Sequence, residues 1–409
     1  MRTGASIFVQ AGIEFREVIL VKKLKLIAAV MIGVMLISCG GRAEKPAEPE
    51  LEFSRRNESL PPELPSTEAI SGGYEPLNYA ETIGMWFPYM DYAEYMSGKS
   101  EEEFRRLVQE KFTAAAGELV NTVYLHIHPC GDAYYSSDIY PSGTYLDGDY
   151  DPLEIMLDEA HKLGLSVHVW LNPLRCQTVE QMEKLPEDYI VKKWTEASVG
   201  TLVNTVNGRW YLNPACEEVV DLLCRTVDEI VRNYDVDGVH IDDYFYPTTS
   251  PDFDKISFEA SGHADLSEWR LNNCNRLVHA MYESVKRVNC DVQFGISPQG
   301  NINANYNTQY ADVREWAANP GYCDYIIPQI YYGFLNETCP FSETLDAWEA
   351  MVTNKNIRLI IGLAAYKQNA HDEWAGAAGE NEWIENPDLL QQQIELVMTS
   401  SAQGYALYY

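Results

Sequence analysis

Eight short apolar runs, each followed or preceded by an amphipathic helical stretch, constrain the fold of this 409-residue chain more than any other feature. Alternating strands and helices favour a parallel sheet, and eight such units predict an α/β fold of the (β/α)8 TIM-barrel type. The runs span residues 83–88, 122–128, 166–172, 238–243, 293–299, 325–331, 358–366 and 404–409. The last run reaches the end of the sequence, so we expect the eighth helix to be missing from this chain.

Local signals predict where the intervening helices begin. Asp151-Pro152-Leu153-Glu154 offers a capping carboxylate, proline at the first helical position and glutamate in the first turn, and Gly164 is placed to end that helix. Asn213-Pro214 repeats the start signal before an apolar helical face. These signals support helices laid against a sheet.

The net charge restricts the class of partner. Against 30 lysines and arginines stand 61 aspartates and glutamates, which gives −31. An acidic surface repels polynucleotides, so we expect no nucleic-acid partner. The nine cysteines show neither a CxxC pair nor a Cys/His ladder at zinc spacing, so we expect no structural metal, no cofactor and no disulfide framework.

The first 77 residues have the composition of a targeting segment and a tether. Three lysines at 22, 23 and 25 precede the apolar run 26–37, and Leu36-Ile37-Ser38-Cys39 resembles a bacterial lipobox. We therefore expect a signal peptide over 1–39, with 1–20 a start-site extension, lipid on Cys39, a disordered tether over 40–77 and a folded domain over 78–409. The mature protein would be exported, anchored by lipid to the cell membrane and facing the cell wall. A signal anchor with an incidental cysteine is the alternative.

Strand alternation predicts which side chains enter the barrel. If the aliphatic positions face the helices, polar and aromatic groups from seven strands converge on the barrel mouth, where active sites of such barrels lie. The inward set is Trp86, His126, His128, His168, Trp170, Asn172, His240, Asp242, Ser297, Gln299, Gln329, Tyr331 and Tyr366. Rings and hydrogen-bonding groups suit a sugar ligand, although the tryptophans could equally fill the barrel and the glutamines bridge strands.

Asp242 is the first candidate for a catalytic group, because a carboxylate buried at the end of a strand costs several kcal/mol unless it is paired. Asp243 is the second, although it can share a site with Asp242 only if the strand has bent, since neighbouring strand residues face opposite ways. Asp91 and Asp132 could also reach the mouth, but solvated loop acids are the simpler interpretation for both.

Several motifs together resemble those of the bacterial glycosyl-hydrolase-like 10 proteins, over roughly residues 80–409. They are Trp170-Leu171-Asn172-Pro173-Leu174-Arg175, Trp210-Tyr211-Leu212-Asn213-Pro214, Asp235-Val236-Asp237-Gly238, Asp242-Asp243-Tyr244-Phe245-Tyr246-Pro247, Ile296-Ser297-Pro298 and Pro328-Gln329-Ile330-Tyr331, with Gly131-Asp132-Ala133-Tyr134-Tyr135 after the second strand. The resemblance implies a barrel glycoside hydrolase, frequently an exported lipoprotein, with cell-wall glycan of the peptidoglycan type or a related polysaccharide as substrate.

Strand alternation and the motifs together give the candidate site residues. The catalytic candidates are Asp242 and Asp243. Substrate-binding candidates are Trp86, His126, His128, Asp132, Trp170, Asn172, Arg175, His240, Tyr244, Tyr246, Gln299, Gln329, Tyr331 and Tyr366. The family usually has an arginine before the proline that follows the second strand, and His128-Pro129 stands here instead, which puts substrate specificity in doubt.

The mechanism is left open by the sequence. Glycoside hydrolysis normally uses two carboxylates, about 5 Å apart for retention and about 6.5–9.5 Å apart for inversion. The fourth strand also resembles the DGxDxDxE motif of chitinase-type enzymes, with Tyr244 in place of the acid and His240 in place of an inner aspartate; there Asp242 would orient a substrate acetamido group. Two alternatives are a metal-dependent deacetylase, in which His126 and His128 pair as in amidohydrolases, and a glycan-binding protein without catalysis.

Overall fold

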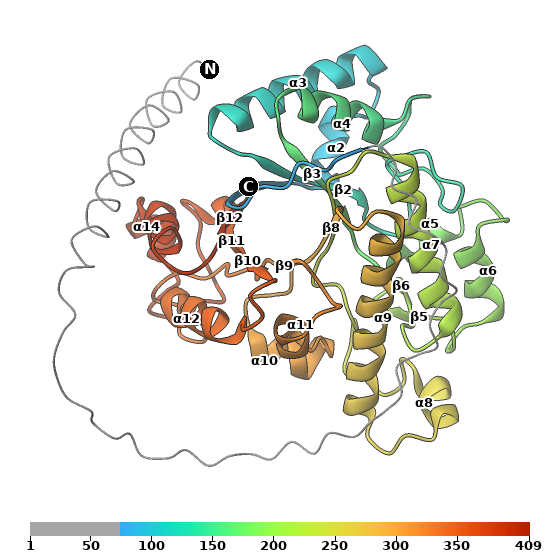
Figure 1. Ribbon diagram of the computed structural model, residues 1–409. Helices are drawn as coiled ribbons and strands as arrows, with labels where there is room; N and C mark the ends of the chain where they lie inside the picture. Colours follow the sequence, from blue (N-terminus) through green and yellow to red (C-terminus); the bar gives the residue numbers. More distant parts are fainter. Residues whose placement is uncertain (1–73) are drawn as a thin grey trace. The chain divides into compact units, whose positions relative to one another are not determined.

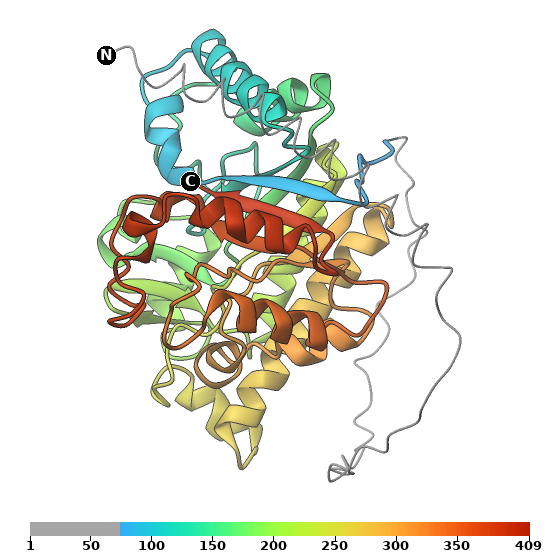
Figure 2. The same ribbon diagram turned by 90° about the vertical axis from the view of Figure 1, so that its left-hand side faces the viewer.

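The computed structural model describes residues 74–409, and the predicted barrel lies within them. The predicted signal peptide, Cys39 and most of the tether fall outside the described residues. All eight apolar runs form strands of one parallel sheet, and helices surround the ring of strands in two perpendicular views (Figures 1 and 2). The (β/α)8 fold is therefore confirmed.

The sheet closes through its seventh strand, which is broken at Ile360. The part before the break pairs with β9 and the part after it with β12, so that the order β10-β9-β8-β7-β3-β2-β1-β12-β11 returns on itself. The strands are β1 Thr82–Phe87, β2 Thr122–His128, β3 Ser166–Leu171, β7 Gly238–Ile241, β8 Gln293–Ile296, β9 Tyr325–Ile326, β10 Arg358–Leu359, β11 Ile361–Ala364 and β12 Gly404–Tyr408.

The helices lie mostly between consecutive strands of the barrel. They are α2 Tyr92–Tyr95, α3 Glu101–Gly117, α4 Pro152–Lys162, α5 Val179–Met182, α6 Ile190–Ala197, α7 Glu217–Asn233, α8 Lys255–Ser261, α9 Leu266–Val288, α10 Ile302–Ala304, α11 Val313–Ala318, α12 Phe341–Met351, α13 Glu382–Glu385 and α14 Leu389–Val397, with 3-10 turns η1 Tyr89–Asp91 and η3 Ala365–Lys367 and a π-helix η2 Asn305–Gln309. Among the described residues no helix is long and apolar enough to cross a membrane.

The predicted start of α4 is confirmed, whereas that of α7 is wrong by three residues. Asp151 accepts hydrogen bonds from the backbone N–H groups of Leu153 and Glu154, and Gly164 ends the turn after α4 with φ +71°. Asn213 instead bonds the N–H of Ala215 in a separate turn, so α7 begins only at Glu217. A capping signal thus identifies a turn without fixing which residue starts the helix.

A small antiparallel sheet, which the sequence analysis did not predict, is inserted after β3. It contains β4 (Arg175–Thr178), β6 (Arg209–Leu212) and β5 (Val203–Val206), in that order. Strands β5 and β6 form a hairpin whose turn places Asn207 at φ 50° and Gly208 at φ 77°, the positive values that a tight two-residue hairpin turn requires. This sheet fixes the position of Arg175 beside the barrel mouth.

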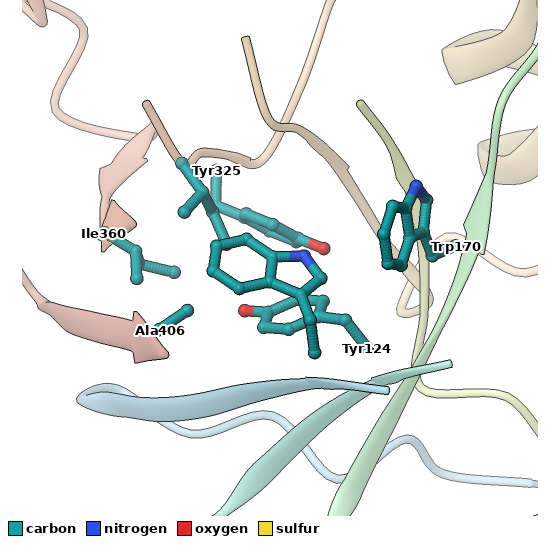
Figure 3. Packing of buried hydrophobic residues seen from close by; sticks show 7 residues of the cluster. Tyr124, Trp170, Tyr325, Ile360 and Ala406 are labelled. Carbon is teal, nitrogen blue, oxygen red and sulfur yellow. The ribbon is translucent and has the colours of Figure 1, made fainter. Parts of the chain in front are cut away.

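Large aromatic residues fill the barrel interior. Trp86, Tyr124, Trp170 and Tyr325 pack with small and branched residues from later strands (Figure 3). Gly84 allows this packing, since an added Cβ would lie 2.7 Å from the ring of Tyr124. The barrel is therefore a solid core below its mouth, as inward-facing residues of eight-stranded barrels generally make it.

The first described residues contact the barrel rather than extending away from it. The Tyr74 hydroxyl donates to Oδ1 of Asp237 at 2.7 Å, and the backbone N–H of Leu77 donates to the same oxygen at 2.5 Å. The Asp237 carboxylate also accepts from the N–H of Val167. Residues 74–77, which we assigned to the tether, thus contact the N-terminal side of β3 and β7 through Asp237.

Candidate active site

A cavity of about 200 Å³ opens where the barrel strands end. Its walls combine six tryptophan and tyrosine side chains from different strands and loops with two carboxylates, one arginine and several amide or imidazole groups. The lining residues are Trp86, Tyr89, Met90, His126, Trp170, Asn172, Arg175, Asp242, Asp243, Tyr244, Gln329, Tyr331 and Tyr408. Ten of them belong to the predicted site set.

Asp242 follows the last residue of β7 and points into the barrel, as the alternation of its strand predicts. Its side chain is buried, with 3% exposed, and accepts hydrogen bonds from Trp170 Nε1 at 3.1 Å and from the backbone N–H of Tyr244 at 3.2 Å. Burial raises the pKa of Asp242 well above its ordinary range, and the neighbouring charge of Asp243 raises it further. Its protonated form is therefore more favoured than that of an exposed aspartate.

Asp243 lines the same cavity because the chain bends where β7 ends at Ile241. This bend was the condition under which both acids could share a site. Gln309, the last residue of the π-helix, donates from Nε2 to the Asp243 carbonyl oxygen at 2.8 Å and holds the bend. Burial raises the pKa of Asp243, while hydrogen bonding from Gln329 and Gln309 partly offsets the effect. The two acids thus share one environment and interact.

Trp170 and His126 form a stacked pair in the cavity wall, with ring centroids 3.6 Å apart and planes inclined by 10°. Neither ring nitrogen of His126 has a hydrogen-bond partner, although the side chain is buried. Asn172 lies beside it but is already paired, with the Trp170 indole and with the carbonyl of Pro129. Burial lowers the pKa of His126 well below its ordinary range, so the imidazole is neutral and has one unused donor and one unused acceptor.

His240 and His168 lie beneath the cavity in a buried hydrogen-bond chain. Trp86 Nε1 donates to His240 Nε2 at 3.2 Å, so His240 carries its proton on Nδ1 and donates to the hydroxyl of Tyr325, which in turn donates to His168 Nδ1 at 2.7 Å. Burial lowers the pKa of His240 to about 3. Because the indole N–H of Trp86 is hydrogen-bonded to His240, Trp86 presents only its ring to the cavity.

Arg175 enters the cavity from the small sheet. Its register partner is Tyr211 of β6, and its guanidinium lies 4.8 Å from the centroid of the Tyr244 ring. This cation–π contact orients a cation beside the two aspartates, and its charge acts against the burial that raises their pKa.

Three of the predicted site residues, His128, Asp132 and His240, make internal hydrogen bonds around the cavity and do not line it. His128 Nδ1 donates to the carbonyl of Asp132 at 2.8 Å, and its ring packs against Tyr140. The Asp132 carboxylate accepts from the N–H of Cys130, and burial raises its pKa to about 6. His240 lies below the floor. None of the three lines the cavity.

Tyr246, Gln299 and Tyr366 also lie outside the cavity lining. Tyr246 is buried, where its hydroxyl accepts from Asn273. Gln299 forms an isolated backbone bridge with Gln329, whose own side chain donates to the carbonyl oxygen of Ser297 at 3.0 Å. Tyr366 is 48% exposed at the rim, in edge contact with the rings of Tyr331 and Tyr408.

The structure adds three residues that the sequence analysis did not name: Tyr89, Met90 and Tyr408. Tyr89 and Met90 belong to the turn after β1, for which strand alternation makes no prediction. Tyr408 is different, because it follows the inward Ala406 by two positions on β12, so the same alternation could have identified it.

The acids considered at the mouth and the histidines of the deacetylase alternative do not converge. Asp91 pairs with Lys111 at 3.4 Å. His126 faces the cavity and His128 does not. Within residues 74–409 no group of three or more His, Cys, Asp or Glu side chains could hold a metal ion. The eight cysteines in this part of the chain are free thiols.

Fold and site together define a (β/α)8 barrel with an aromatic cavity and two carboxylates at the C-terminal ends of its strands. Residues 83–376, more than half of the chain, match the model of the family described as Glycosyl hydrolase-like 10, and the chain belongs to that family. The resemblance drawn from the sequence motifs is thereby confirmed.

Curated relatives agree with this assignment. The chain is 33% identical over 311 residues to glycosyl hydrolase YngK of Bacillus subtilis (strain 168), a match that covers 69% of this chain and 59% of the relative. It is 34% identical over 277 residues to glycosyl hydrolase DigH of Escherichia coli (strain K12), covering 61% and 63%. The chain thus spans about six tenths of the length of these relatives.

A solved structure supports the fold. Alpha-L-fucosidase isoenzyme 2 from Paenibacillus thiaminolyticus superposes with a TM-score of 0.51 at 14% identity, over 80% of this chain and 46% of that chain. At this identity the likeness concerns the barrel alone.

Proposed function

We propose that this protein is a glycoside hydrolase that cleaves glycosidic bonds in a cell-wall polysaccharide of the peptidoglycan type. The observation that carries the proposal is the pair Asp242 and Asp243, two interacting carboxylates with raised pKa values in one cavity. Carboxyl groups whose pKa values are shifted toward neutrality are suited to protonate a leaving glycosidic oxygen. Membership of the family and the glycosyl hydrolase names of its relatives favour the same reaction class.

The cavity wall suits a sugar ring. Trp86, Tyr331 and Tyr408 offer ring surfaces on which the C–H face of a sugar packs, while Asn172, Gln329 and the unpaired nitrogens of His126 offer hydrogen bonds to hydroxyl groups. Since the chain carries a net charge of −31, an anionic part of the polymer would be accepted best beside Arg175, the cation of the cavity lining.

We further propose that the protein is exported and held at the cell membrane by lipid on Cys39, where its substrate is the cell wall. It rests on the lysines, apolar run and lipobox of residues 22–39. The matching test compares wild type with Cys39→Ala in membrane fractions. The variant should be soluble or unprocessed, and a variant that still requires detergent for extraction would contradict lipidation.

The enzymatic test measures new reducing ends when the purified protein is incubated with peptidoglycan glycan strands. The Asp242→Asn/Asp243→Asn double variant is the inactive control, and circular dichroism verifies its fold. Cleavage by wild type alone supports the proposal. Glycan binding without new reducing ends would favour the non-catalytic alternative, and release of acetate instead of reducing ends would favour the deacetylase.

A further inference from the structure

The two acids of the cavity are neighbours in the chain, and this arrangement has a mechanistic consequence. Asp242 and Asp243 both belong to the end of β7, and they are the only acidic residues among those that line the cavity in the described part of the chain. The other acids near the mouth are engaged elsewhere: Asp132 with the N–H of Cys130, Asp91 with Lys111, and Asp372 with Lys367.

Ordinary glycosidases place their two carboxyl groups on either side of the scissile bond, one to protonate the leaving oxygen and one to supply or activate a nucleophile from the opposite side. Here the lining contributed by the later strands is neutral. It consists of Gln329 and Tyr331 after β9 and Tyr408 at the end of β12. None of these side chains can act as a carboxylate nucleophile.

We propose that the missing nucleophile comes from the substrate, which must therefore be a 2-acetamido sugar at the bond that is cut. This inference rests on the proposed function and assigns separate roles to the two aspartates. The acetamido carbonyl oxygen attacks the anomeric carbon while the bond from that carbon to the leaving oxygen breaks, and Asp243 gives its proton to the leaving oxygen. Asp242 accepts a hydrogen bond from the acetamido N–H and stabilises the positive charge of the resulting oxazolinium ring.

The second half of the reaction returns every group to its starting state. Water attacks the anomeric carbon, Asp243 takes the proton of that water, and the bond to the acetamido oxygen breaks to restore the amide. Because the anomeric carbon is substituted twice, the product has the configuration of the substrate.

Burial and hydrogen bonding determine which aspartate has which role. Asp242 is the deeper group and is held by two donors, Trp170 Nε1 and the N–H of Tyr244, which suits a fixed acceptor. Asp243 is half-buried, nearer to the solvent from which the leaving group departs and water arrives. A third donor, the acetamido N–H, would favour the charged form of Asp242 and leave the proton of the interacting pair with Asp243.

The test uses one glycan with a graded series of 2-substituents: acetamido, difluoroacetamido and trifluoroacetamido. Fluorine makes the carbonyl oxygen a poorer nucleophile without adding charge or removing the N–H. We expect kcat/KM of the wild-type protein to fall along the series by at least about 10²-fold in total, because an intramolecular nucleophile contributes a large share of the rate. NMR of the first product should show retained anomeric configuration.

The outcomes separate this inference from the proposed function. Cleavage that is equally fast across the series, or inversion at the anomeric carbon, would overturn the substrate-derived nucleophile while the glycosidase assignment stands. No cleavage of the acetamido glycan itself would contradict the proposed function. A trapped covalent bond between the sugar and either aspartate would replace the inferred mechanism by an enzyme nucleophile.

Discussion

The indole N–H of Trp170 donates a 3.1 Å hydrogen bond to Oδ2 of Asp242 and shares the same proton with Oδ1 of Asn172. The tryptophan therefore acts on the carboxylate through its edge, while its face stacks on His126. A hydrogen bond to a charged group contributes about 1.5–3 kcal/mol. Trp170, which the sequence suggests as a ring surface for a sugar, therefore also influences the charge of Asp242.

Trp170→Phe keeps an aromatic ring against His126 and removes the donor to Asp242. The charged form of Asp242 loses support, so its pKa rises further and the acidic limb of the kcat/KM profile moves to higher pH. We expect kcat/KM near neutral pH to fall by about 10- to 100-fold. A pH profile whose acidic limb stays in place would show that the Trp170–Asp242 bond does not matter to the reaction.

His126→Phe tests the unpaired imidazole. The ring keeps its stacking on Trp170, but the two nitrogens that a sugar hydroxyl would satisfy are lost. We expect KM for the glycan to rise about tenfold with a smaller effect on kcat, and the free energy of unfolding to increase by about 1 kcal/mol, because a buried unsatisfied polar group costs about 1–3 kcal/mol. His128→Phe is the control, because His128 donates a hydrogen bond to the backbone carbonyl oxygen of Asp132. This substitution should destabilise the protein without the same rise in KM.

Arg270 holds the segment that follows the two aspartates. Its fully buried guanidinium pairs with Asp254 and donates to the carbonyls of Thr248 and Ser250. Arg270→Met leaves Asp254 charged and unpaired, so we expect a loss of about 3–5 kcal/mol in urea unfolding. Converting Asp254 to Asn in the same protein should restore part of that loss.

The matched control for Arg270 is Arg106→Met, which removes an exposed helical pair with Glu110. Such pairs contribute less than about 0.5 kcal/mol. Equal effects of the two substitutions would mean that the buried pair does not stabilise the loop.

Asp242→Asn should stabilise the fold in a pH-dependent way. Because burial raises the pKa of Asp242 in the folded protein, the folded state holds this proton more tightly than the unfolded chain. Its contribution is fully present below the ordinary pKa of an aspartate and is lost as the pH rises toward the raised value. The variant should therefore be more stable than wild type at pH 7 and differ little from it near pH 3. A pH-independent difference in urea unfolding would contradict a raised pKa.

The barrel strands were predictable because each is a short, largely apolar run that is mostly buried, whereas the strands of the small sheet are not. Val203–Val206 and Arg209–Leu212 are four residues long and largely half-exposed, so they have no apolar pattern. Asn207-Gly208, a typical hairpin turn, was the signal available. Without that hairpin the position of Arg175 could not be derived.

Within the site, strand alternation predicted which side chains point into the barrel but not how far below the barrel mouth each one lies. It placed Asp242 and His240 on the same inward face, yet His240 lies in the hydrogen-bond chain below the floor and Asp242 lines the cavity. How far a residue lies below the mouth depends on the stagger of neighbouring strands, which a single strand does not encode. The bend that brings Asp243 beside Asp242 depends on Gln309, distant in sequence and part of a π-helix, so it could only be stated as a condition.

The central claim is that Asp242 takes part in the reaction, and the most direct measurement compares glycan cleavage by wild type, Asp242→Asn and Asp91→Asn. The asparagine keeps the shape of the Asp242 side chain, while Asp91 is a mouth-side acid outside the cavity lining that serves as the control. With folding verified by circular dichroism, we predict a fall in turnover of about 10²- to 10⁴-fold for Asp242→Asn and a change of less than about twofold for Asp91→Asn. A folded Asp242→Asn protein that cleaves glycan at nearly the wild-type rate would contradict the account.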